Sequence, residues 1–119
     1  MVLIENSKLR RNFGVNENDL IAIQHFLQGS VYCWVKNRSG EIFALRDLMG
    51  GSNFDWKGTP LYCLYEKHIA SGKDSDAAIK EAGKDLGGIL KIVLKEDKRT
   101  YETHEKDMSK GYRWVGSEP

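Results

Sequence analysis

Residues 99–115 carry the pattern that most restricts the fold, because one strand register satisfies both their aromatic and their charged side chains. That register pairs bulky residues with one another and opposite charges with one another: Tyr101 with Trp114, Thr103 with Tyr112, Glu102 with Arg113, and Glu105 with Lys110. A shift of one residue would send the aromatic side chains to both faces. We therefore expect a β-hairpin that turns at residues 106–109.

Two helices are expected to precede this hairpin. Thr59-Pro60 predicts a helix start, with Thr59 as N-cap and Pro60 at the first helical position, where its missing N–H costs nothing. Apolar and aromatic side chains between Leu61 and His68 share one face of that helix, and Gly72 is placed to end it. Residues 71–75 then form the turn to the second helix.

The second helix begins near Ser75 or Asp76, and its extent depends on Gly87-Gly88. Apolar residues keep a 3.6-residue period on both sides of the two glycines: Ile79, Ala82, Leu86, Ile89, Leu90 and Val93. This shared phase favours one long helix, although each glycine costs about 1 kcal/mol relative to alanine. The alternative ends the helix at Leu86 and makes residues 89–95 a strand, which their β-branched side chains would suit.

The first half of the chain has weaker signals. Residues 1–17 are expected to form an extended or partly ordered arm, followed by a helix from Asp19 to Asn37 with Asn16 or Asn18 as N-cap. A short strand at residues 42–44 and a single helical turn at residues 45–49 follow. The rings of Phe54 and Trp56 are expected to be buried, because two exposed rings so close together would form a hydrophobic surface patch that promotes association.

These elements predict a mainly α protein with a C-terminal β-hairpin (α+β), as a single domain over residues 18–116 after an N-terminal arm over residues 1–17. Over residues 18–115 the order of elements resembles a winged helix-turn-helix domain. The resemblance rests on that order and identifies no particular family. It implies a second helix that enters a DNA major groove or binds a partner protein, and a hairpin wing that adds a contact.

Five lysines are the candidate nucleic-acid contacts. Three lie within a narrow sector of the second helix and two lie at the hairpin tip: Lys80, Lys84, Lys91, Lys106 and Lys110. Lysines on an outer helix face contact phosphates, and Gly87 between them would let a backbone approach closely. Glu81 and Asp85 form an acidic stripe beside the lysines, however, and the hairpin register already matches Lys110 with Glu105. An ordinary solvated face is therefore the competing interpretation.

The charge balance leaves two functions open. The whole chain carries a net charge of +1, and residues 72–113 hold ten Lys or Arg against nine Asp or Glu. Nucleic-acid-binding domains usually have a basic excess, because neutralising phosphates supplies most of their affinity. We therefore expect a small binding protein with a nucleic-acid-binding or regulatory role, or alternatively a protein-interaction module that can form a homodimer.

Other functional classes have little support in the sequence. The histidines His25, His68 and His104 lie on three different elements, and Cys33 and Cys63 form no metal-ligand spacing, so no metal or other cofactor is expected. No nucleophile, phosphate-loop or dinucleotide motif occurs, so we do not expect an enzyme. A small-ligand binder is the third and less favoured alternative, and a deep apolar pocket near Trp56 and Arg46 would support it. No apolar run approaches the ~18 residues of a membrane helix, and the acid at Glu5 argues against a signal peptide. A cytoplasmic protein with reduced thiols is the resulting prediction.

Overall fold

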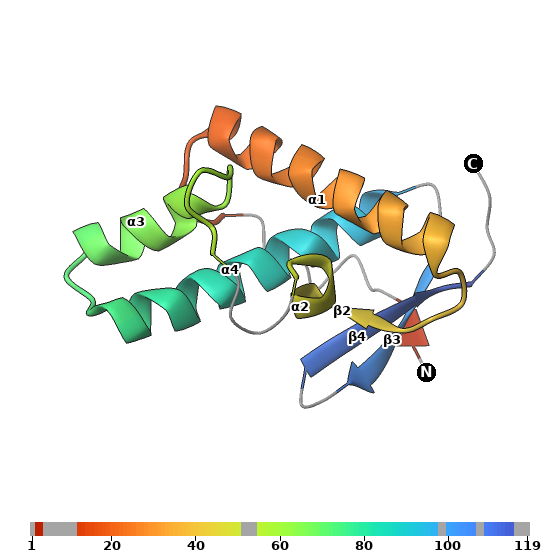
Figure 1. Ribbon diagram of the computed structural model, residues 1–119. Coiled ribbons are helices and arrows are strands. Elements are labelled where there is room, and N and C mark those ends of the chain that lie inside the picture. Colours follow the sequence, from red (N-terminus) through yellow and green to blue (C-terminus); the bar gives the residue numbers. More distant parts are fainter. Residues whose placement is uncertain (1, 4–11, 51–54, 98–99, 107–108, 116–119) are drawn as a thin grey trace.

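A small antiparallel sheet lies at one end of a bundle of helices (Figure 1). The computed structural model describes residues 2–3, 12–50, 55–97, 100–106 and 109–115. The elements follow one another along the chain as β1 Val2–Leu3, α1 Glu17–Asn37, β2 Phe43–Ala44, α2 Leu45–Leu48, α3 Tyr62–Ala70, α4 Ser75–Glu96, β3 Tyr101–Lys106 and β4 Ser109–Trp114. The expected fold class, mainly α with a C-terminal β-hairpin, is confirmed.

The helix α1 forms where its cap and its apolar stripe predict it. The side chain of Asn16 accepts a hydrogen bond from the backbone N–H of Asp19 at 2.8 Å, which satisfies one of the free donors of the first turn. The buried side chains of α1 recur every four residues and face the core: Ile23, Leu27, Val31 and Val35. The predicted strand and helical turn that follow are also present, as β2 and α2.

The predicted start of α3 at Thr59-Pro60 is wrong, because α3 begins at Tyr62. Thr59 instead closes a tight turn: its hydroxyl donates to the carbonyl oxygen of Trp56 at 2.7 Å and accepts from the N–H of Leu61 at 3.2 Å. These bonds hold residues 56–61 in a turn, and the helix starts two residues later than expected. The predicted end is confirmed, since Gly72 follows α3 with a φ of +102°.

The long helix α4 runs unbroken through Gly87-Gly88, so the alternative strand over residues 89–95 is wrong. Asp74 caps it by accepting a hydrogen bond from the N–H of Ala77 at 2.8 Å. Gly88 has a packing role, because the buried ring of Phe13 lies against it. A Cβ added to Gly88 would lie 2.9 Å from Cε1 of Phe13. Glycine lowers the helix propensity at this position, but its missing side chain lets the ring of Phe13, which precedes α1, pack directly against α4.

The hairpin has the predicted register, with Tyr101 opposite Trp114 and all the following pairs in place. Its turn residues 107–108 lie outside the described residues. The sheet order is β1-β3-β4-β2, so the two-residue strands β1 and β2 border the hairpin on its two edges. Residues of the predicted N-terminal arm thus contribute both a strand, β1, and the buried Phe13 to the fold.

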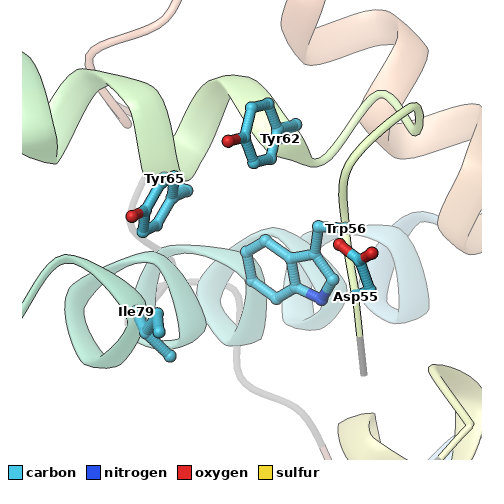
Figure 2. A pocket seen from close by; sticks show the side chains of 5 residues that line it. All are labelled: Asp55, Trp56, Tyr62, Tyr65 and Ile79. Atoms are coloured by element: carbon cyan, nitrogen blue, oxygen red, sulfur yellow. The ribbon is translucent and has the colours of Figure 1, made fainter. Parts of the chain in front are cut away.

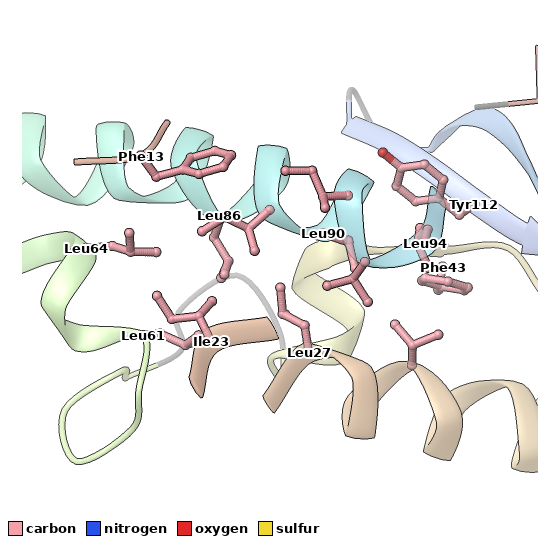
Figure 3. Packing of buried hydrophobic residues seen from close by; sticks show 14 of the residues in the cluster. Phe13, Ile23, Leu27, Phe43, Leu61, Leu64, Leu86, Leu90, Leu94 and Tyr112 are labelled. Atoms are coloured by element: carbon pink, nitrogen blue, oxygen red, sulfur yellow. The ribbon is translucent and has the colours of Figure 1, made fainter. Parts of the chain in front are cut away.

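The core lies between α1, α3, α4 and the sheet, and Figure 3 shows its leucine-rich centre. Phe43 of β2 links the helices to the hairpin. Its ring centroid lies 5.8 Å from that of Trp34 on α1, and 6.3 and 6.0 Å from those of Tyr101 and Tyr112. These spacings are typical of attractive ring pairs. Trp56 is half-buried, and Phe54 lies outside the described residues.

Candidate nucleic-acid interface

A hollow of about 690 Å³ lies where α4, α2 and β4 meet, and cationic side chains surround it. Four of its lining residues are basic and come from three different elements: Arg46 from α2, Lys84 and Lys91 from α4, and Lys110 from β4. Half of the α4 residues that line the hollow are glycines, at positions 83, 87 and 88. The result is a concave basic surface in which the α4 backbone is accessible.

Local structure explains why these side chains converge. Lys84 and Lys91 are seven residues apart on α4, which places them on one side of the helix two turns apart. Lys110 is two residues from Tyr112 on β4, so both side chains lie on the sheet face that borders the hollow. Arg46 belongs to a short helix whose first turn is held by Asp47, which accepts a hydrogen bond from the N–H of Ala44 at 2.7 Å.

One acid of the predicted acidic stripe does not face the lysines at all. Asp85 is buried, with a 3% exposed fraction, and points toward α3. Its Oδ2 lies 2.8 Å from Nζ of Lys67 and 2.7 Å from Nε2 of His68, and Lys67 also donates to the carbonyl oxygen of Phe13. This buried network ties α3, α4 and the segment before α1 together. His68 therefore lies at the core edge, as a hydrogen-bonded side chain.

The other acid of that stripe, Glu81, pairs with Lys84 along the helix surface at 3.3 Å. Such exposed pairs contribute between 0 and about 1 kcal/mol, so a phosphate can compete for this lysine. The lining residues of the hollow that the structure describes include no Asp or Glu. The hairpin register does place Glu105 opposite Lys110, so the basic character of the hollow depends mainly on Arg46, Lys84 and Lys91.

The far face of the hairpin neutralises its own charge. Glu102 is buried and bonded to two basic side chains, Arg113 and His104, with His104 Nε2 at 2.7 Å. The hydrogen bond from His104, and then the contact with Arg113, lower the pKa of Glu102. His104 is half-buried in this cluster. Burial also raises the pKa of Tyr112, beside the hollow, to about 12, so its hydroxyl stays neutral at physiological pH.

The structure brings together three of the five predicted contact residues, Lys84, Lys91 and Lys110. Lys80 is exposed one turn before Lys84 and does not line the hollow. The side chain of Lys106 lies outside the described residues. Arg46 was not predicted as a contact, because its approach to α4 depends on how α2 packs, and its neighbours in sequence carry no sign of this.

No protein-family model matches the chain, and neither a curated protein nor a solved structure matches it. No helix in the described part of the chain is long and apolar enough to cross a membrane. Over the same residues, no three His, Cys, Asp or Glu side chains gather into a metal-binding group. Cys33 is exposed and Cys63 is half-buried, and both are free thiols.

Proposed function

We propose that this protein binds nucleic acid, with the sugar-phosphate backbone lying in the hollow between α4, α2 and β4. The observation that carries the proposal is the convergence of four cationic side chains from three elements on one concave surface. Cations scattered on a solvated face would show no such convergence. The element order that resembles a winged helix-turn-helix domain supports the same conclusion.

The chemistry of the hollow suits phosphates. Each lysine or arginine that neutralises a phosphate releases condensed counterions, which supplies affinity without base contacts. Gly83 and Gly87 have no atom within 4 Å of the place where a Cβ would stand, so this side of α4 is open to a ligand backbone. Contacts of this kind fix the position of the strand and carry no sequence information. The proposed activity is thus binding, in a nucleic-acid-binding or regulatory role, and not catalysis.

A homodimer or another protein partner is the alternative function, supported by the net charge of only +1. Sedimentation velocity distinguishes the two. A stable dimer that buries Lys84 and Lys91 would favour the alternative, whereas a monomer that binds an oligonucleotide favours nucleic-acid binding. We further propose that the protein acts in the cytoplasm, for which the free thiols of Cys33 and Cys63 are the support.

The direct experiment is fluorescence anisotropy with a labelled oligonucleotide, titrated at several salt concentrations. Binding through phosphates predicts that log K falls with log salt by about 0.7–0.9 per phosphate contacted. Lys84→Glu, Lys91→Glu and Lys110→Glu should each weaken binding and lower this slope. Lys36→Glu is the matched control, because it makes the same charge change on the exposed end of α1 and should leave affinity nearly unchanged.

A second variant tests the hollow itself without altering charge. Gly87→Leu places a side chain where the structure leaves open space, and leucine is well tolerated within helices. We expect this variant to fold and to lose most of its oligonucleotide binding. If Lys36→Glu weakened binding as much as the lysines of the hollow do, or if Gly87→Leu bound normally, this site would be wrong.

A further inference from the structure

A second cavity, of about 280 Å³, lies between α3, α4 and the turn before α3, and aromatic rings line it (Figure 2). Trp56 lies between the two helices, Tyr62 and Tyr65 project from α3, and Ile79 closes the α4 side. The carboxylate of Asp55 stands beside the indole of Trp56. The cavity is therefore an apolar, ring-lined space with one acidic acceptor at its border.

The rings are held in place before any ligand arrives. Tyr62 and Tyr65 stack with their ring centroids 5.4 Å apart and their planes 27° apart. The hydroxyl of Tyr65 lies 3.1 Å from the Ser75 hydroxyl at the start of α4. The turn that carries Trp56 is closed by the Thr59 hydrogen bond, and Asp55 accepts from the N–H of Lys57 at 2.9 Å. Little conformational entropy is left to lose on binding.

This aromatic cavity and the basic hollow are neighbours along α4. Ile79 lines the cavity and Gly83 lines the hollow, and these residues are four apart, so they lie on the same side of the helix. The separation along the helix axis is about 6 Å, since each residue advances 1.5 Å. Lys80, next to Ile79 and one turn before Lys84, is exposed and extends the basic stripe toward the cavity.

We propose that the aromatic cavity receives one unpaired base of a single-stranded nucleic acid, whose adjoining phosphates lie against Lys80 and in the basic hollow. This inference rests on the function proposed above and specifies its substrate class. Rings beside a positively charged groove are how proteins hold single strands, because every base offers a π-face. A base inside a duplex is already stacked and paired, so it cannot enter a side cavity without costly unstacking.

Asp55 gives the cavity a preference among bases. A carboxylate accepts hydrogen bonds and donates none. Guanine presents two neighbouring N–H donors on its pairing edge, whereas thymine presents one donor between two carbonyl oxygens that a carboxylate repels. We therefore expect one dG within a dT tract to raise affinity relative to dT alone. Asp55→Asn should remove this preference, while stacking is kept.

The decisive experiment compares three probes of equal length by anisotropy at one salt concentration: an oligo-dT strand, the same strand with abasic sugars, and a duplex. The abasic strand keeps the phosphates and lacks the rings. Stacking of one base predicts that the intact strand binds about tenfold tighter than the abasic strand. Tyr65→Leu should abolish this difference and leave abasic binding unchanged, which also shows that the variant is folded. Tyr32→Leu, at an exposed tyrosine of α1, is the matched control and should keep the difference.

The outcomes separate the two proposals. If no probe binds, the proposed function itself fails. If the intact strand, the abasic strand and the duplex bind equally well, or if Tyr65→Leu behaves like Tyr32→Leu, nucleic-acid binding stands and the base-binding cavity is wrong. If only the intact strand binds tightly and Tyr65→Leu removes that advantage, both proposals hold.

Discussion

Gly87 and Gly88 provide a sharp test of the packing, because adjacent glycines of one helix should respond oppositely to the same substitution. Replacing glycine by alanine inside a helix gains about 1 kcal/mol. At Gly87 the new methyl group meets nothing within 4 Å, so Gly87→Ala should stabilise the protein by nearly this amount. At Gly88 the methyl group would lie 2.9 Å from Cε1 and 3.3 Å from Cζ of the buried Phe13 ring.

Overpacking of this kind typically costs about 1–3 kcal/mol. The propensity gain offsets part of that cost, so Gly88→Ala should be neutral to destabilising by about 2 kcal/mol. The difference in free energy of unfolding between the two alanine variants should then be about 1–3 kcal/mol. Urea unfolding followed by circular dichroism measures it directly.

A double-mutant cycle identifies the cause. Phe13→Leu removes the two ring atoms that Gly88→Ala would contact, so in this background Gly88→Ala should become stabilising, as Gly87→Ala is. Two results would refute the reasoning. One is equal stabilisation by both alanine substitutions in the native background, and the other is a cost at Gly88 that persists after the Phe13 ring is removed.

Three further predictions concern buried polar groups. Asp85→Ala should lower the free energy of unfolding by about 3 kcal/mol in urea melts, because it leaves the half-buried cation of Lys67 without its carboxylate. A loss below about 1 kcal/mol would contradict the importance of this buried network. Burial raises the pKa of Tyr112 from 10.0 to about 12, so the neutral side chain contributes its full stabilisation below pH 10. The free energy of unfolding should fall by about 2–3 kcal/mol as the pH rises to 12, and it should fall less in Tyr112→Phe. The pKa of Glu102 is lowered from 4.5, chiefly by the hydrogen bond from His104, so its stabilisation is present above pH 4.5 and is lost as the pH falls through the lowered value. In urea melts from pH 6 to 3, Glu102→Gln should reduce this loss of free energy of unfolding at acid pH. An unchanged loss would count against the cluster.

Local and periodic features of the chain were predictable from sequence. The hairpin register followed from pairs such as Tyr101–Trp114, because strand side chains alternate and one shift would break every pair. The continuity of α4 across Gly87-Gly88 followed from the common apolar phase on its two sides. In both cases, the information lies within about twenty consecutive residues.

Features that depend on packing between distant segments were not predictable. Asp85 looks like a surface acid because Glu81 precedes it by one turn, but its partners Lys67 and His68 lie on another helix. Arg46 reaches the hollow only because α2 packs near α4 and β4. No local pattern in sequence records such approaches, and the basic hollow therefore became visible only in three dimensions.

The two edge strands of the sheet also bear on how the chain is made. Among the residues that the structure describes, β1 at Val2–Leu3 and β2 at Phe43–Ala44 pair only with strands of the C-terminal hairpin. During synthesis, α1, α3 and α4 can begin to pack as they leave the ribosome, but neither edge strand has a partner until β3 and β4 have emerged. The sheet therefore closes last, and a nascent chain stalled before residue 100 would display the unpaired β1 and β2 segments to chaperones.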